Sequence, residues 1–309
     1  MNRHALRPLA ASFALCSSIT LAGCMVSVDS SEYTAREEKR FEVPQGVPDV
    51  TLATFDGSVE IRSWDQAAVQ VEVEKRGPNQ QMAEAIEVRA EQAGHLITLT
   101  VKKPAGETGG FLRQSPTARL IALVPRRAKI AVRSGDGSIT VERVEGDLDL
   151  DTADGSVRGY DLAGRLRIHT GDGSVRLEQV SGWVDVDTGD GTVSLAGKLQ
   201  SVKVVTGDGG VVVRAEEGSE MADPWEVRTG DGGVRLEIPP GFAANLDAST
   251  ADGRVRLEGI GEEADREPEP AGEEVRDERS RRELKRQLNG GGKLLRLRSG
   301  SGTITVAGL

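Results

Sequence analysis

Cysteine, histidine and aromatic residues are scarce in this chain of 309 residues, which holds 2 Cys, 3 His and 3% aromatics. Two cysteines cannot form a disulfide framework or a four-cysteine zinc site. The histidines stand far apart, at His4, His95 and His169, so no His/Cys cluster indicates a metal centre. Few aromatics together with 38 Gly favour many short strands joined by tight turns over a core built on large rings.

Positive charge is also in deficit, with 39 Lys and Arg against 49 Asp and Glu, and a net charge of -10. Binding to a phosphate backbone needs the opposite balance, so we expect no nucleic-acid partner. The chain has no P-loop and no serine-nucleophile elbow, which leaves little support for an enzyme. A carbohydrate-active enzyme that uses paired carboxylates stays as a third-ranked alternative.

The first residues have the pattern of a secretion signal. Arg3 and Arg7 precede a largely apolar run over 9–21, which is too short to span a bilayer as a helix. Leu21-Ala-Gly-Cys24 follows at once and resembles the bacterial lipobox. The resemblance implies removal of residues 1–23 and acylation of Cys24, hence a membrane partner reached through a lipid anchor. It also implies that the mature chain has no free thiol, since Cys16 leaves with the signal.

The residue after Cys24 is Met25 rather than Asp, which resembles the pattern of outer-membrane lipoproteins. We therefore expect a location in the cell envelope, anchored by lipid at the outer membrane.

A six-residue repeat dominates the middle of the chain. Its form is small-Gly-Asp-Gly-small-β-branched, as in Thr170-Gly-Asp-Gly-Ser-Val175. Five copies are spaced by 18 residues, two looser copies follow at Asp231 and Asp252, and an outlying copy surrounds Asp56. The aspartates of the five regular copies are Asp136, Asp154, Asp172, Asp190 and Asp208.

Between successive repeats lie two short stretches of alternating apolar and polar residues, such as Val184-Asp-Val-Asp187. This alternation predicts strands with one buried face. Hairpins would account for the Asp-Gly turns, but only a solenoid explains a constant period, because equal coils keep residues in register. We predict an all-β, single-stranded parallel β-solenoid with coils of about 18 residues and stacked Asp-Gly turns.

The second glycine of each repeat is expected in the turn because glycine accepts a positive φ. These turn-forming glycines are Gly137, Gly155, Gly173, Gly191, Gly209, Gly232 and Gly253. If the turns stack, the five regular aspartates would lie about 5 Å apart and become candidate calcium ligands. The simpler interpretation is that each aspartate hydrogen-bonds within its own turn, so we expect no resident cofactor.

The remaining chain divides by composition. Residues 24–40 form an expected lipidated tether before a solenoid domain over 41–309. That domain has an irregular part (41–133), regular repeats (134–260), a charged helical or disordered insertion (262–292) and closing strands (293–309). The insertion is expected to be solvated, with a partner-binding helix over 273–288 as the alternative. Trp64, Trp183 and Trp225 either fill the coils or stack on a ligand.

Four segments together resemble a known bacterial family. They are the envelope-targeting N-terminus, Gly57-Ser-Val-Glu-Ile-Arg-Ser-Trp64, the Thr-Gly-Asp-Gly-Ser-Val repeats, and Leu288-Asn-Gly-Gly-Gly-Lys-Leu-Leu-Arg-Leu-Arg298 with a final Gly302-Thr-Ile-Thr-Val306. Over 41–309 the chain resembles the DUF4097 family, whose members often carry the label "putative adhesin". The resemblance implies a β-helix-like solenoid and transfers no catalytic residue.

These observations predict a non-enzymatic, lipid-anchored envelope protein that acts as an adhesin or interaction scaffold, with an unidentified protein or glycan ligand. The alternative is a structural or sensing lipoprotein that faces the periplasm and binds a protein partner. A fold alone does not decide between them.

Overall fold

The computed structural model describes residues 33–43, 46–104, 115–260 and 282–309. The predicted signal peptide (1–23), Cys24, the first part of the tether and most of the charged insertion lie outside these ranges. Within them, no helix is long and apolar enough to cross a membrane.

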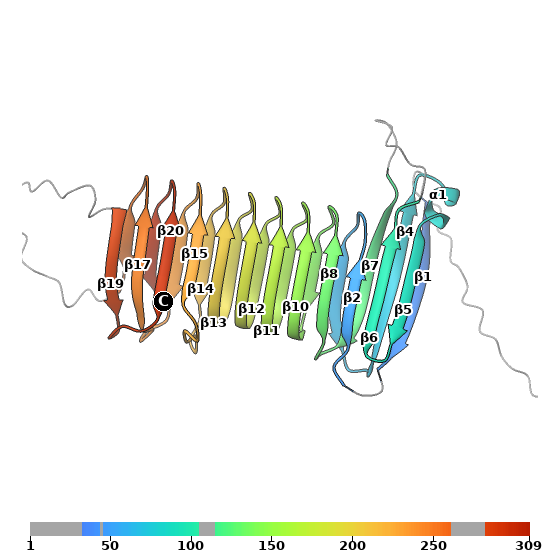
Figure 1. Cartoon of the computed structure of the whole chain (residues 1–309), viewed down its shortest axis with the longest axis horizontal. Coiled ribbons are helices and arrows are strands. Elements are labelled where there is room, and N and C mark those ends of the chain that lie inside the picture. The colour runs from blue at the N-terminus through green and yellow to red at the C-terminus, as the bar shows by residue number, and fades with distance from the viewer. Residues whose placement is uncertain (1–32, 44–45, 105–114, 261–281) are drawn as a thin grey trace, which may run out of the picture.

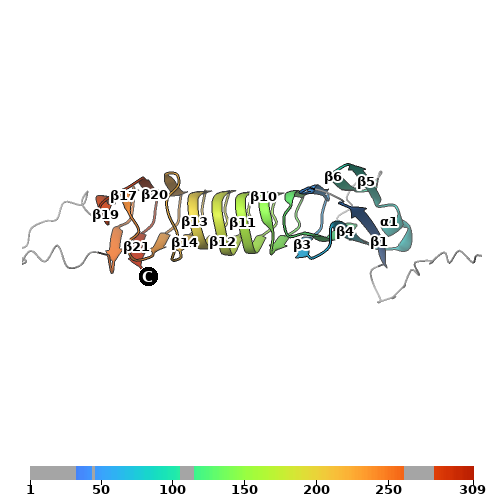
Figure 2. The same cartoon turned by 90° about the horizontal axis from the view of Figure 1, so that it is seen from below.

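The strands lie side by side along one long axis and form a long open sheet that winds in two rows (Figures 1 and 2). Row A carries, in spatial order, β5 (Glu87–Ala93), β6 (Leu96–Lys102), β2 (Asp49–Ala53), β8 (Lys129–Ser134), β10 (Glu145–Thr152), the second halves of β11 (Val157–Thr170), β12 (Val175–Thr188) and β13 (Val193–Thr206), then β15 (Trp225–Thr229), β20 (Leu294–Ser299), β17 (Ala244–Thr250) and β19 (Glu283–Leu288).

Row B lies beneath row A and likewise consists of strands that pair side by side along the long axis. It carries β1 (Tyr33–Glu42), β4 (Ala68–Gly77), β7 (Thr117–Pro125), β3 (Val59–Trp64), β9 (Ile139–Glu142), the first halves of β11 to β13, then β14 (Val211–Ala215), β16 (Val234–Ile238), β21 (Ile304–Gly308) and β18 (Val255–Glu258). The all-β architecture agrees with the sequence prediction.

The register of the central strands follows the sequence repeat. Strands β11 and β12 are parallel, and Val157 pairs with Val175 while Thr170 pairs with Thr188, so partners are 18 residues apart. Alternate residues such as Val184 and Val186 are buried between the two rows. The buried aliphatic side chains form one continuous core along the axis. Such a narrow interior suits Val, Leu and Ile, which explains the scarcity of aromatics.

Spatial order departs from chain order at both ends. Strand β2 lies between β6 and β8, and β3 lies between β7 and β9, so the strands β4 to β7 extend outward past β2 and β3. In the same way β20 and β21, the predicted closing strands, do not close the stack: they lie between β15–β16 and β17–β18. The last strands of the chain are therefore internal to the solenoid.

The two ends also depart from a purely parallel sheet. Strands β1, β4 and β7 pair antiparallel at one end, as do β5 and β6, and β19 pairs antiparallel with β17 at the other. A short helix, α1 (Gln80–Glu84), is capped by the Asn79 side chain, which accepts a hydrogen bond from the Met82 amide at 2.9 Å.

Two predicted boundaries were wrong. Residues 33–40, expected in the tether, belong to β1, which is stabilised by ion pairs such as Arg36–Glu74 at 2.7 Å. Its mostly polar sequence hides the apolar alternation by which strands are recognised. Residues 283–288, expected in a helical or disordered insertion, form β19, which pairs antiparallel with β17 and buries Leu288. The expected insertion residues 262–281 lie outside the described ranges.

Candidate binding face

The turns that join row A to row B stack directly on one another. The expected turn glycines lie there, but their φ angles fall outside the left-handed region, so the expected reason for glycine was wrong. A Cβ on Gly173 would lie 2.0 Å from the carbonyl oxygen of Gly155, one turn back, and a Cβ on Gly191 would lie 2.1 Å from that of Gly173. Glycine is required because each turn rests on the backbone of the preceding one.

The Ser or Thr at the first position of each repeat forms hydrogen bonds to the turn backbone from the interior of the solenoid. The Thr170 hydroxyl is buried and donates to the Gly155 carbonyl at 3.0 Å, and it accepts from the Gly173 amide at 3.2 Å. Equivalent hydroxyls donate to the glycine carbonyl of the preceding turn from Ser134, Thr152, Thr188, Thr206, Thr229, Thr250 and Ser299. This buried hydroxyl ladder satisfies carbonyls that the turn would leave without partners.

The aspartates of the repeat point outward at the tips of the turns. Asp136, Asp154, Asp172, Asp190 and Asp208 are all exposed, as are Asp231 and Asp252. Backbone contacts place Asp56 next to Asp136, and Ser301 between Asp231 and Asp252. Among the described residues, no group of three or more His, Cys, Asp or Glu side chains is placed to hold a metal ion.

A second glycine ladder lies at the opposite corner of each coil. Gly146, Gly164 and Gly182 are 18 residues apart and have φ of 145°, 120° and 121°. A Cβ on Gly164 would lie 2.2 Å from the Gly146 carbonyl oxygen. The 18-residue spacing of these glycines is visible in the sequence and is the signal that identifies this corner.

The outward side of row A carries an ordered pattern of charge. One line of register partners crosses eight strands and alternates in sign throughout. We call it the alternating column; it consists of Asp149, Arg167, Asp185, Lys203, Glu226, Arg296, Asp247 and Lys285. Neighbouring strands in a sheet are about 4.8 Å apart, so opposite charges attract along the column where like charges would repel. Lys203 and Asp185 approach to 3.4 Å.

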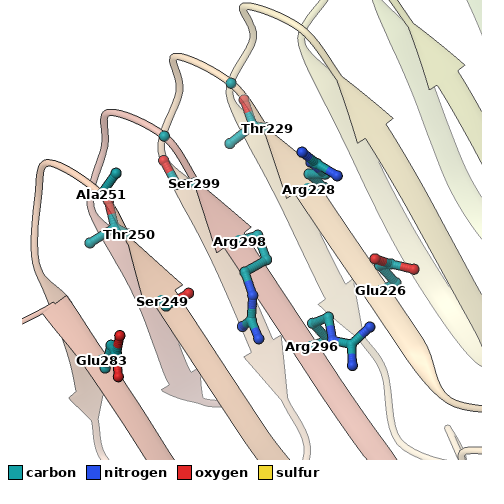
Figure 3. A pocket seen from close by; sticks show the side chains of 12 residues that line it. Glu226, Arg228, Thr229, Ser249, Thr250, Ala251, Glu283, Arg296, Arg298 and Ser299 are labelled. Atoms are coloured by element: carbon teal, nitrogen blue, oxygen red, sulfur yellow. The ribbon is translucent and has the colours of Figure 1, made fainter.

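The neighbouring line of partners, two residues further along each strand, does not alternate in sign and places two cations side by side. Arg228 and Arg298 are direct register partners in β15 and β20. They line a hollow of about 660 Å³ with Arg296, Ser249 and turn backbone from Gly230, Ala251 and Gly300 (Figure 3). Two carboxylates, those of Glu226 and Glu283, also line it.

Arg298 is tied to the protein on one side of this hollow. Its guanidinium donates to an Asp247 side-chain oxygen at 2.8 Å and to the Asp247 carbonyl at 2.7 Å. That hydrogen bond holds the pKa of the Asp247 carboxyl below its usual value. In the described part of the chain, by contrast, neither Arg228 nor Arg296 makes an ion pair, and the Arg296 Nε is buried without a hydrogen-bond partner.

The three tryptophans have different environments. Trp225 is fully buried and packs on Phe242, with ring centroids 5.2 Å apart. Trp64 donates to the Ala68 carbonyl at 2.8 Å, under the Arg40 guanidinium. Trp183 is 37% exposed on row A, where Arg165 lies 6.0 Å above its ring and its indole donates to Asp223 at 3.2 Å. Of the three tryptophans, only Trp183 is exposed.

A comparison with protein families gives a match over most of the chain. The sequence model of the Toastrack DUF4097 family matches residues 48–307. No curated protein sequence matches the chain.

Among solved structures, this chain is similar to a "putative adhesin" from Bacteroides fragilis, with 12% identity, 89% of this chain and 97% of that chain covered, and a TM-score of 0.39. A "putative lipid binding protein" from Parabacteroides distasonis gives 12% identity, coverage of 89% and 96%, and a TM-score of 0.41. A "putative cell adhesion protein" from Clostridium sporogenes gives 13% identity, coverage of 89% and 100%, and a TM-score of 0.28.

Proposed function

The chain belongs to the Toastrack DUF4097 family, and from this premise we propose that it is a non-enzymatic, lipid-anchored envelope protein whose solenoid serves as an adhesin-like binding surface. The observation that carries the proposal is the outward side of row A. Eight successive strands present charged side chains there in one continuous register. Stacked repeats commonly use such extended surfaces for recognition.

The rigidity of this face supports a role in binding. Each strand is fixed by in-register pairing with its neighbours, and each turn by a buried hydroxyl and a close glycine contact. A surface that is already ordered loses little conformational entropy when a ligand binds. The ligand in this proposal is a protein or glycan with its own regular array of charged groups.

The anchor in this proposal is the acylated Cys24. It is tested by expressing the chain and a Cys24→Ser variant in a bacterial host and measuring the mass of the mature N-terminus. We expect an acylated Cys24 in the wild type and retention with membranes. A variant that still fractionates with membranes to the same extent would contradict lipid anchoring.

The side of the envelope is decided by protease digestion of intact and permeabilised cells. Digestion of the solenoid in intact cells would support display at the surface, where an adhesin must act. Protection until permeabilisation would exclude adhesion and direct the search to a periplasmic partner.

A further inference from the structure

We propose that the hollow over β15, β20 and β17 binds a phosphate group through Arg228, Arg296 and Arg298. This inference deepens the binding role proposed above and rests on it only for the choice of face. It takes its evidence from the one place where two adjacent strands of row A carry arginines in direct register.

The first step concerns the electrostatic repulsion between Arg228 and Arg298. Register partners on adjacent strands are about 5 Å apart, and two like charges at this distance repel by about 1 kcal/mol in water and by more near a protein surface. In the alternating column each cation has an anionic partner on both sides wherever the column continues. Arg228 instead has Val205 on one side and Arg298 on the other.

The second step concerns which cations the protein itself neutralises. Asp247 forms an ion pair with Arg298. Glu226 and Glu283 line the hollow, but neither forms an ion pair with the three arginines within the described ranges. The Nε of Arg296 is buried and makes no hydrogen bond in this state. Among the described residues Arg228 has no ion-pair partner, and Arg296, although it lies between Glu226 and Asp247 in the alternating column, forms no ion pair with either and has a guanidinium nitrogen without a hydrogen bond (Figure 3).

The third step concerns the chemistry of the ligand. Arginine is always protonated and presents a planar fork of donors that matches the oxygens of phosphate. A phosphomonoester carries a charge between about -1.5 and -2 near neutral pH and offers three strong acceptor oxygens. It can contact three arginines at once, whereas a single carboxylate has half the charge and fewer acceptors. The Ser249 side chain, next to Arg298 in register, supplies a neutral donor for a hydroxyl of the same ligand.

The hollow is open to two sources of phosphate, a phosphorylated sugar or a lipid headgroup. The purified full chain is titrated by calorimetry with glucose 6-phosphate, with inorganic phosphate and with glucose at constant ionic strength. In parallel a chain that begins at Met25, and so lacks the proposed signal and anchor, is mixed with vesicles of phosphatidic acid, whose headgroup is a phosphomonoester, or of phosphatidylcholine and sedimented. Binding of glucose 6-phosphate and not of glucose identifies a sugar source. Sedimentation with phosphatidic acid and not with phosphatidylcholine, reversed by inorganic phosphate, identifies the lipid source.

Three variants test whether the arginines of the hollow bind the phosphate. Arg228→Gln and Arg296→Gln are each expected to weaken phosphate binding at least tenfold. Arg256→Gln is the matched control, because Arg256 is an exposed arginine on β18 in row B. The proposal is overturned if neither phosphate source binds, if acetate binds as tightly as phosphate, or if Arg256→Gln loses as much affinity as the two site variants. Such a failure would leave the lipid anchor and the side of display untouched.

Discussion

Glu226 and Arg296 are direct register partners on adjacent parallel strands, although 70 positions separate them in the chain. Without β20, the next strand beside β15 in chain order would be β17, and Glu226 would face Asp247. The inserted strand places a cation between two anions and preserves the alternating column. Charge therefore favours the observed strand order over the sequential one.

The alternating column predicts an asymmetry between two aspartates of β12. Asp185→Lys would place three cations in a row, between Arg167 and Lys203, and we expect it to lower the free energy of unfolding by about 0.5–1 kcal/mol. Asp187→Lys lies between His169 and Val205 and should cost less. Urea denaturation of both variants at low and high salt measures the difference. Equal losses, or a difference that salt does not reduce, would contradict an electrostatic column.

The stacked turns predict a large effect of a single methyl group. Gly173→Ala would bring Cβ to 2.0 Å from the Gly155 carbonyl oxygen, and the shift of backbone that relieves this contact should cost about 2–3 kcal/mol. Gly210→Ala is the matched control, because its Cβ would find only the Gly233 oxygen, at 3.9 Å. Thermal unfolding of both variants distinguishes them. A Gly173→Ala protein as stable as the control would show that the turns are not in contact.

The hydroxyl ladder predicts that threonine is needed for its oxygen and not for its shape. Thr170→Val keeps the volume but leaves the Gly155 carbonyl and the Gly173 amide with one partner fewer, which should cost about 1–3 kcal/mol. Thr192→Val, at an exposed turn position of the next repeat, should change stability by less than about 0.5 kcal/mol. Denaturant unfolding compares the two. If Thr170→Ser is close to the wild type in stability while Thr170→Val is not, the role of the hydroxyl is confirmed.

The Asp247–Arg298 pair predicts a dependence of stability on pH. Because the folded-state pKa of Asp247 is lowered by its hydrogen bond to Arg298, its contribution is present above the ordinary value of 3.8 and is lost as pH falls through the lower folded value. Asp247→Asn should therefore be less stable than the wild type at pH 7, and the gap should close below pH 3.8. Denaturant unfolding of both proteins at a series of pH values measures this difference in stability. A gap that stays constant with pH would assign the loss to packing.

The exposed aspartates at the turn tips predict a lack of response to calcium. Each is exposed, so repulsion between neighbours is weakened by solvent and gives little drive to bind an ion. We expect the same melting temperature with millimolar calcium and with chelator. A rise of several degrees that the chelator reverses would establish the aspartate ladder as a calcium site.

The sequence was sufficient to predict the strands and turns of the local repeat, but not the pairing between strands that are distant in the chain. Alternation around Val184 and Val186 and the spacing of the aspartates were enough for strands, turns and stacking. Nothing local marks β20 as a strand that lies beside β15, because its partner is set by long-range pairing. The polar strand β1 was missed for a related reason: it pairs with β4 along its whole length, forms ion pairs with it, and buries few apolar side chains. The meeting of Arg228 and Arg298 depends on that same non-sequential order.

The internal position of the last strands has a consequence for synthesis. During synthesis β15 to β18 are made before β20 and β21, so the slot between β15 and β17 stays unfilled until β20 has been made. During that interval Glu226 and Asp247 lack the cation that separates them. This end of the solenoid can therefore complete its folding only after β20 and β21 have been synthesised, and a product truncated before residue 294 would keep an unfilled slot for as long as it survived.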